Sequence, residues 1–188
     1  MSQADLFPEN PNRRFVVGLA GPAGSGKDTV AGMLRSATGC ETYAFAGPLK
    51  EALKILGIHE PRSREAKEAL LPGRTYSYRT AAQRLGTEFA RSLDPNFWQD
   101  LAEKCTKGAH AIAFTDVRFE NEAQWIRNQG GVIWHIKGRK TTVTGENAKH
   151  ASEVPLEVSP LDRVIHNDGS MEQLQAWVST LLKEWANG

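Results

Sequence analysis

The chain has 188 residues, of which 40% are hydrophobic and 24% charged, as in ordinary globular proteins. Twenty-three Lys and Arg against 22 Asp and Glu give a net charge of +1, which argues against a dedicated nucleic-acid-binding protein. No stretch approaches the ~18 apolar residues of a membrane span, and the polar start lacks the apolar run of a signal peptide. The two cysteines, Cys40 and Cys105, have no metal-ligand spacing, so we expect buried thiols in a cytoplasmic protein.

Strand-like and helix-like patterns alternate after a loose tail at residues 1–14. Strands are expected at residues 15–19, 42–46, 110–115, 132–136 and 162–166. Helices are expected after the first strand, from Pro48 onward, over residues 119–129, and after Ser170, which forms a capping-box pattern with Gln173. Such alternation predicts a parallel sheet covered on both faces, in one α/β three-layer domain over residues 15–188.

Several side chains are expected to be solvent-exposed or to pack in the core without a role in function. Residues 61–91 are predicted to be mostly helical and are basic, with Arg62, Arg64 and Lys67 as solvated bystanders. Core packing is the expectation for a set of four tryptophans, Trp125, Trp134, Trp177 and Trp185. A polar loop at residues 137–153 is long for a compact domain, and such loops are more often functional than idle.

A glycine-rich turn follows the first strand and precedes the first helix. Its sequence is Gly21-Pro22-Ala23-Gly24-Ser25-Gly26-Lys27, which matches the GxxxxGK pattern in the right structural context. Glycines allow successive backbone N–H groups to point inward, and the helix that follows adds its positive N-terminal end. The turn therefore predicts a site for nucleotide phosphates, with Lys27 reaching the β- and γ-phosphates.

The residue after the lysine departs from the usual motif, which has Ser or Thr as a magnesium ligand. Here that position is Asp28, followed by Thr29. A carboxylate beside a triphosphate repels it unless a cation lies between them. Asp28 is thus either a direct or water-mediated Mg²⁺ contact or an N-terminal helix cap, and the two alternatives stay open. Thr29 is a candidate hydrogen-bond donor to the α-phosphate.

A second set of charged residues follows the third expected strand. Asp116 is placed at the strand's carboxyl end, which in parallel sheets faces the ligand crevice, and Arg118 comes two residues later. Asp116 could orient Mg²⁺ or the acceptor oxygen, and Arg118 could hold a phosphate. No NKxD guanine-reading motif occurs in the chain. A small-molecule kinase is therefore favoured over a GTPase switch.

An ordered set of motifs carries a family resemblance. The motifs are Gly26-Lys27-Asp28-Thr29, Phe45-Ala46-Gly47-Pro48-Leu49-Lys50-Glu51, Gln83-Arg84-Leu85-Gly86-Thr87-Glu88, Asp94-Pro95-Asn96-Phe97-Trp98, the run 115–123 (TDVRFENEA), His150-Ala151-Ser152-Glu153 and the run 164–169 (VIHNDG). Together they resemble the deoxynucleoside monophosphate kinases typical of bacteriophages, from about Phe15 to the C-terminus.

The resemblance implies a P-loop nucleoside monophosphate kinase fold with a five-stranded parallel sheet. It also implies a helical acceptor-binding part at about residues 48–107 and a lid at about 137–153. The implied reaction transfers the γ-phosphate of ATP, with Mg²⁺, to a deoxynucleoside monophosphate, giving the diphosphate. A phage-encoded enzyme would work in the host cytoplasm. No nucleic-acid or membrane partner is implied, and a homodimer is one open alternative for its assembly.

The resemblance also implies roles for individual residues. ATP is expected to contact Gly21, Ala23, Gly24, Ser25, Gly26, Lys27, Asp28, Thr29, Arg139, Asn167 and Gly169, with the last two near the adenine. The acceptor is expected to contact Lys50, Arg79, Gln83, Arg84, Thr87, Arg91 and Arg118. Lys27, Asp116, Arg118 and the lid residue Arg139, beside Lys140, are the expected catalytic residues, and Asp28 and Asp116 the metal ligands.

Two alternatives stay open beside this kinase. The run Gly47-Pro48-Leu49-Lys50-Glu51 and the Gly-Lys-Asp ending also resemble the animal-type phosphomevalonate kinases. A non-enzymatic ATP-binding module that governs a partner is the other alternative, although such a module needs no second phosphate-binding cluster.

Overall fold

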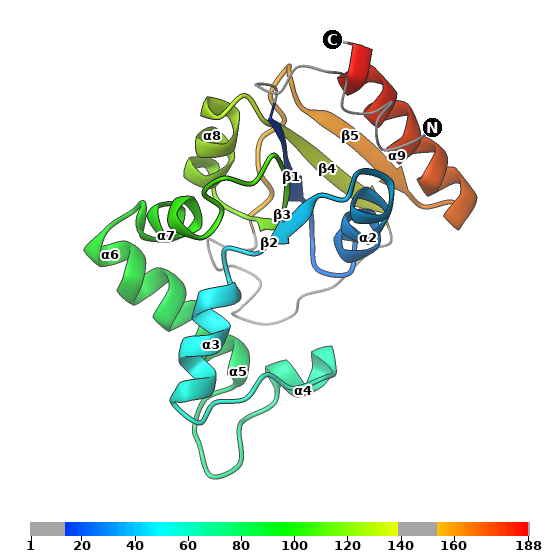
Figure 1. Cartoon of the computed structure of the whole chain (residues 1–188). Helices are drawn as coiled ribbons and strands as arrows, with labels where there is room; N and C mark the ends of the chain where they lie inside the picture. The colour runs from blue at the N-terminus through cyan, green and yellow to red at the C-terminus, as the bar shows by residue number, and fades with distance from the viewer. Residues whose placement is uncertain (1–13, 139–153, 188) are drawn as a thin grey trace. The chain divides into compact units, whose positions relative to one another are not determined.

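The structure is a computed structural model that describes residues 14–138 and 154–187, in two compact units (Figure 1). The first unit contains residues 14–44, 106–138 and 155–187, and the second contains Phe45–Cys105 and residue 154. The expected tail, apart from Arg14, and the expected lid beyond Gly138 lie outside the described residues. Arg14 itself donates hydrogen bonds to the carbonyl oxygens of Ala109 (2.7 Å) and Thr106 (3.1 Å).

The sheet of the first unit has five parallel strands, as predicted. They are β1 (Phe15–Ala20), β2 (Glu41–Tyr43), β3 (Ala111–Val117), β4 (Val132–Gly138) and β5 (Arg163–Asn167), in the order β2-β3-β1-β4-β5. Strand β2 is earlier and shorter than the predicted 42–46, because the chain turns at Phe45 and Ala46 is the N-cap of the next helix. The predicted α/β class is confirmed.

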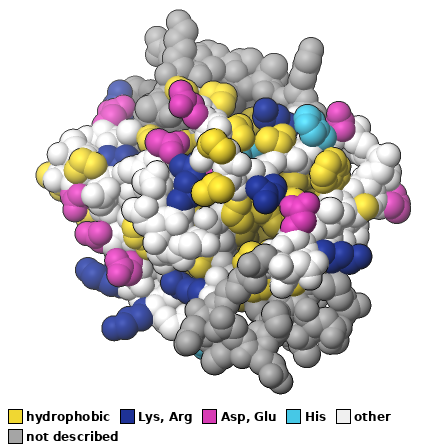
Figure 2. Space-filling model, turned by 90° about the horizontal axis from the view of Figure 1, so that it is seen from above, with side chains coloured by type: hydrophobic (Ala, Val, Ile, Leu, Met, Phe, Trp, Pro, Cys, Tyr) yellow, Lys and Arg dark blue, Asp and Glu magenta, His cyan; other side chains and the backbone are white. Residues whose placement is uncertain are grey.

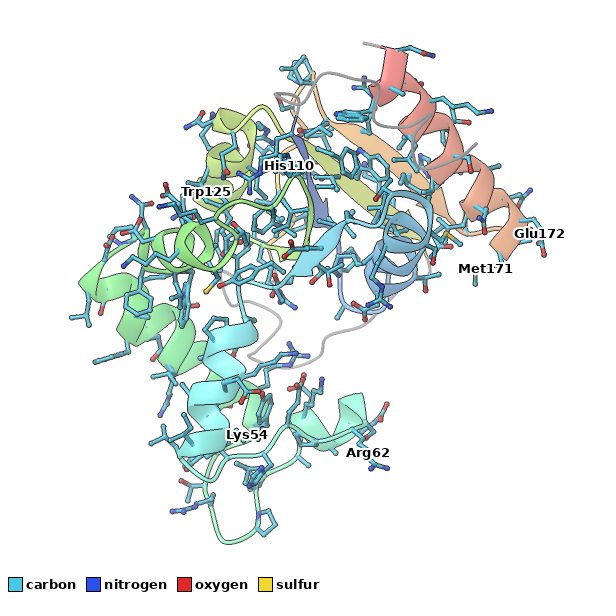
Figure 3. All side chains as sticks on the ribbon, in the orientation of Figure 1. Lys54, Arg62, His110, Trp125, Met171 and Glu172 are labelled. Carbon is cyan, nitrogen blue, oxygen red and sulfur yellow. The ribbon has the colours of Figure 1, made fainter. Side chains whose placement is uncertain are left out.

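Helices cover both faces of this sheet (Figure 1). Helices α2 (Lys27–Thr38) and α9 (Met171–Asn187) share a core with Phe15, Val17 and Leu19 of β1. The intervening Gly18 faces the other way, since a Cβ on it would lie 2.8 Å from Ile126 of α8 (Glu120–Asn128). On that second face Trp125 of α8 packs edge-on against Phe114, with ring centroids 5.3 Å apart (Figure 3).

The last helix shows both a successful and a wrong prediction. Its capping box is present, because Ser170 N–H donates to Gln173 Oε1 (2.8 Å) and Gln173 N–H to Ser170 Oγ (3.3 Å). Trp134 and Trp185 pack as expected, the latter edge-on against Phe15. Trp177 is 42% exposed, so its assignment to the core was wrong. It lies at the margin of a stripe that Leu174, Val178, Leu181 and Leu182 already fill.

The second unit is helical. Its helices are α3 (Gly47–Ile55), α4 (Arg64–Glu68), α5 (Tyr78–Gln83), a π-helix η1 (Arg84–Ala90), α6 (Arg91–Leu93) and α7 (Phe97–Cys105). The prediction that residues 61–91 are mostly helical holds only in part, because an antiparallel bridge between Leu70 and Ser77 closes a non-helical loop. Helix α3 starts with Pro48 in its first turn, as predicted.

The surface mixes charges of both signs. Figure 2 shows Lys and Arg interspersed with Asp and Glu on one face. Within the described residues no helix has the length and apolar character that membrane crossing requires. Cys40 is buried, as expected, whereas Cys105 at the end of α7 is exposed, which corrects the expectation of two buried thiols.

Candidate functional site: a phosphate-binding loop and a basic helical unit

The glycine-rich loop at residues 21–27 links β1 to α2, and its glycines have conformations that other residues rarely adopt. Gly21 has φ +140°, and a Cβ there would lie 2.5 Å from the carbonyl oxygen of Ile136. Gly26 has φ +101° and is the N-cap of α2, where no side chain caps the helix. The first turn of α2 thus begins without a side-chain cap, and a helix start of this kind favours a bound phosphate.

Lys27 folds back over this loop. Its Nζ donates hydrogen bonds to the carbonyl oxygens of Gly21 (2.8 Å) and Pro22 (2.9 Å). The two carbonyl oxygens thus hold the ammonium group against the glycine-rich loop. Ser25, by contrast, is 1% exposed, and its hydroxyl is buried without a hydrogen-bond partner among the described residues.

Asp28 is an exposed residue in the first turn of α2, next to exposed Thr29. The helix cap is Gly26, so the alternative that made Asp28 the cap is wrong. A carboxylate in the first turn still interacts favourably with the positive end of the helix. Its other expected role, as a contact to Mg²⁺, stays a prediction.

Asp116 lies within β3 and not at its end, because the strand continues to Val117. The register with β1 shifts here: Gly18 pairs with Phe114 but Ala20 with Val117. One extra residue on β3 forms a bulge beside the start of the glycine-rich loop, and such bulges often re-aim side chains next to active sites. Asp116 is half-buried in this bulge.

Arg118 follows β3 on a turn that a buried glutamate holds. Oε2 of Glu122, which is 2% exposed, accepts hydrogen bonds from the backbone N–H groups of Arg118 (2.8 Å) and Phe119 (3.1 Å). Sequence reasoning missed Glu122. The signal was its place three residues after the helix N-cap, where Glu commonly reaches back to the N-terminal backbone.

Asn167, expected near the adenine, ends β5 beside the glycine-rich loop. Its Nδ2 donates a 2.7 Å hydrogen bond to the carbonyl oxygen of Ser25. Close by, Gly169 lines a cavity of about 420 Å³ between the end of β5 and the exposed side of α9. The residues that line it are His166, Asp168, Gly169, Gln173, Ala176, Trp177 and Thr180.

The expected acceptor residues, apart from Arg118, lie in the second unit. Lys50 is on α3, and the others follow one another along consecutive helices as Arg79, Gln83, Arg84, Thr87 and Arg91. Helix α3 packs closely on η1, since a Cβ on Gly86 would lie 2.9 Å from Leu49 Cδ2. The carbonyl of Gly86 accepts a 2.9 Å hydrogen bond from Trp98 Nε1, which identifies buried Trp98 as part of this helical framework. π-Helical turns are frequent at functional sites.

Carboxylates already pair with several cations of this unit. Glu60 bridges Lys50 (3.2 Å) and Lys67 (2.6 Å), so Lys67 is not the solvated bystander that was expected. Burial alone would raise the pKa of Glu60, but the hydrogen bond from Lys67 and the charge of Lys50 hold that pKa below its ordinary value. Burial, together with the negative charge of Glu60, raises the pKa of Tyr78 to about 12.

Two arginines of the helical run differ sharply. Arg79 is paired with Glu68 and its side chain is only 13% exposed. The side chain of Arg84 is 70% exposed, with Glu88 at 3.9 Å. Arg84 is therefore the more accessible of these two candidate phosphate ligands. Arg139 and Lys140 lie outside the described residues, so their expected lid role stays a prediction.

This parallel sheet, with a glycine-rich phosphate loop between β1 and α2, defines a P-loop nucleotide-binding protein. The family model described as deoxynucleotide monophosphate kinase matches residues 62–178, and the chain belongs to this family. Membership confirms the resemblance and favours it over the phosphomevalonate kinases and over a non-enzymatic module. It implies ATP and nucleotides as substrates.

Similar proteins come from viruses. A protein of Acanthamoeba polyphaga mimivirus, provisionally named a deoxynucleotide monophosphate kinase, is 29% identical over 185 residues, covering 87% of this chain and 93% of the viral one. The deoxynucleotide monophosphate kinase of Enterobacteria phage T4 is 29% identical over 116 residues, covering 57% and 46%. That of Escherichia phage RB69 is 30% identical over 115 residues, covering 58% and 46%. The matched part spans about half the length of the two phage proteins.

Two solved structures also match this chain. A sugar kinase from Janibacter sp. HTCC2649 has 22% identity and a TM-score of 0.45, covering 90% of this chain and 94% of that chain. The dephospho-CoA kinase from Campylobacter jejuni has 13% identity and a TM-score of 0.47, covering 92% and 97%.

Proposed function

We propose that the chain transfers the γ-phosphate of ATP to a deoxynucleoside monophosphate and releases the diphosphate. The observation that carries the proposal is the loop at residues 21–27, whose positive-φ glycines and uncapped helix start form an anion site. Family membership supplies the class of acceptor. The acceptor phosphate is already ionised at neutral pH, so the reaction needs positioning and charge more than a strong base.

On the donor side, the backbone N–H groups of the loop hold the phosphates. Lys27 exchanges its carbonyl partners for the β- and γ-phosphate oxygens, and Thr29 reaches the α-phosphate. Gly169 and the neighbouring cavity face the adenine. Lys27 then stabilises the charge that develops on the transferring phosphate, where a preorganised cation is most effective.

The carboxylates on the donor side are suitable ligands for Mg²⁺. The ion is commonly held by one or two carboxylates together with substrate phosphates, and no cluster of three or more ligating side chains is found among the described residues. Asp28 and Asp116 would hold it. Mg²⁺ held there would supply positive charge against the phosphates, and the carboxylates of Asp28 and Asp116 would position it.

On the acceptor side, Arg84 and Lys50 bind the monophosphate, with Gln83 and Thr87 near its sugar or base. Arg118 also contacts the acceptor phosphate, held in place by Glu122 through the backbone. Arg79 and Arg91 complete the basic set. We assign the compact unit Phe45–Cys105 to the acceptor-binding part expected at about residues 48–107.

Two further expectations belong to this proposal. Arg139, in the segment expected to form the lid, contacts the transferring phosphate in the reacting state, so Arg139→Ala should lower kcat and leave ATP binding unchanged.

A homodimer is the proposed assembly, supported by exposed apolar side chains at Phe89 and Leu93 of the second unit. Light scattering of the purified protein tests the assembly.

The experiment that tests the function is coupled-assay turnover with purified acceptors. The panel contains deoxynucleoside monophosphates, ribonucleoside monophosphates and phosphomevalonate, each with ATP and Mg²⁺. The proposal requires ADP production that depends on a deoxynucleoside monophosphate. Acceptor-independent ATP hydrolysis, or turnover only with phosphomevalonate, would contradict it.

A further inference from the structure

Asn167 is enclosed by two glycines from different parts of the first unit. On one side, a Cβ on Gly26 would lie 2.2 Å from Asn167 Nδ2. On the other, a Cβ on Gly138 at the end of β4 would lie 2.2 Å from the Asn167 carbonyl oxygen, opposite which Gly138 pairs in the sheet. Neither neighbour can carry a side chain while Asn167 stays where it is. Asn167 is therefore in close contact with both glycines, and its amide lies against the glycine-rich loop.

The hydrogen bond from this amide sets the orientation of one peptide group. Asn167 Nδ2 donates to the carbonyl oxygen of Ser25 at 2.7 Å. In a planar trans peptide the C=O and the following N–H point in opposite directions. With the Ser25 carbonyl held toward β5, the N–H of Gly26 must point away from β5. Gly26 has φ +101°, a region in which glycine is free to adopt several orientations, so the loop alone does not fix this peptide.

We propose that Asn167 is a positioning residue that locks the peptide between Ser25 and Gly26, and thereby aims the Gly26 N–H at a bound phosphate. The inference rests on the proposed function of the loop as the site for ATP phosphates. It differs from the role implied by the resemblance, in which Asn167 lies near the adenine. The two roles predict different ligand dependence, because only the positioning role acts on a ligand without a base.

The test compares ATP with inorganic tripolyphosphate, which has the phosphates but neither sugar nor base. Calorimetric affinities are measured for the full chain and for Asn167→Ala. We expect both ligands to lose affinity by a similar factor, on the order of 10-fold, which corresponds to one hydrogen bond to a structural carbonyl. The KM for the monophosphate and the melting temperature should stay near those of the unchanged chain. Asn128→Ala, the same change at an exposed position of α8, is the matched control.

Asn167→Leu also removes the hydrogen bond and keeps a side chain of similar volume, so it gives the answer if the alanine variant does not fold.

Two results would overturn the inference. Loss of ATP affinity with unchanged tripolyphosphate affinity would assign Asn167 to the base. Unchanged affinity for both ligands would show that the loop holds its own conformation. Lys27→Ala distinguishes these failures from failure of the proposed phosphate site, because that variant must lose tripolyphosphate affinity if the loop binds phosphates at all.

Discussion

The two units hold their candidate binding residues by different means. In the first, the phosphate loop is fixed by backbone geometry and close contacts: positive-φ glycines, carbonyl oxygens on Lys27 and the amide of Asn167 on Ser25. In the second, side-chain ion pairs hold the cations, with Glu60 on Lys50 and Lys67 and Glu68 on Arg79.

The binding groups of the first unit are therefore rigid, whereas the cations of the second unit can exchange partners. A loop of fixed backbone groups is already in its binding conformation, so it loses little conformational entropy when a ligand binds. A change in this loop should therefore reduce catalysis strongly. A partly exposed ion pair contributes little to the free energy of folding, so its cation can exchange a carboxylate partner for a phosphate. Changes in the second unit should therefore alter acceptor affinity in graded steps. Substitutions in each unit can test this contrast.

The largest effect is expected for Lys27→Ala. The change should lower kcat by on the order of 10²-fold or more, because the ammonium group of Lys27 would no longer stabilise the transferring phosphate. Steady-state kinetics and a thermal melt measure this effect. Lys183→Ala, an exposed lysine on α9, is the control. Near-normal turnover of a folded Lys27→Ala protein would remove Lys27 from the active site.

Arg84→Ala and Arg118→Ala should each raise the KM for the monophosphate much more than the KM for ATP. A bidentate charged contact is worth about 1.5–3 kcal/mol, or roughly 10- to 150-fold. Arg62, an exposed residue of the second unit labelled in Figure 3, provides the control variant Arg62→Ala. Equal changes in both KM values would argue against a specific grip on the acceptor.

Glu60→Gln should have a smaller effect in the opposite direction. The carboxylate competes with the acceptor phosphate for Lys50, so its neutralisation should lower the monophosphate KM by up to about 5-fold, the range of a partly exposed ion pair. The matched control is Glu51→Gln, which removes the exposed pair with Lys54. A raised KM would instead show that Glu60 holds Lys50 in its working position.

Asp162→Asn is expected to leave the kinetic constants unchanged and to alter stability alone. Burial would raise the pKa of Asp162, but hydrogen bonds from Arg127, Ser159 and His135 outweigh it and lower that pKa. The ionised carboxylate therefore stabilises the fold above its unfolded pKa of about 4, and this contribution disappears as pH falls through the lower folded value.

Chemical denaturation across pH measures this effect. The variant should be less stable than the unchanged chain at pH 7 by on the order of 2 kcal/mol, and the gap should shrink at acidic pH. A gap that stayed constant from pH 7 to pH 3 would mean that the charge of Asp162 is not responsible.

Much of the first unit could be predicted because its signals are local. Apolar runs gave the five strands, and the GxxxxGK run gave the loop between β1 and α2. The bulge at Asp116 and the bond from Asn167 to Ser25 could not be predicted, since they depend on how distant strands pair. Trp177 was misassigned because helical periodicity gives a direction but not the edge of the buried stripe.

The second unit was harder to predict. Its basic residues were correctly seen as a cluster, but sequence does not show which carboxylate neutralises which cation. Lys67 was taken as solvated although Glu60 lies 2.6 Å away, seven residues earlier in the chain. The loop closed by Leu70 and Ser77 was also missed, because one isolated bridge leaves no periodic pattern.

The bulge in β3 makes the length of this strand as important as its composition. With regular pairing, Ala20 would lie opposite Asp116, but the extra residue brings buried Val117 there instead. Deleting Thr115 would remove the bulge and place Asp116 opposite Leu19 in regular pairing, while Val117 would stay opposite Ala20, so the side chain of Asp116 would point in a new direction. A one-residue deletion that leaves all charged groups in the chain would thus be expected to disable the site as effectively as losing Asp116 itself.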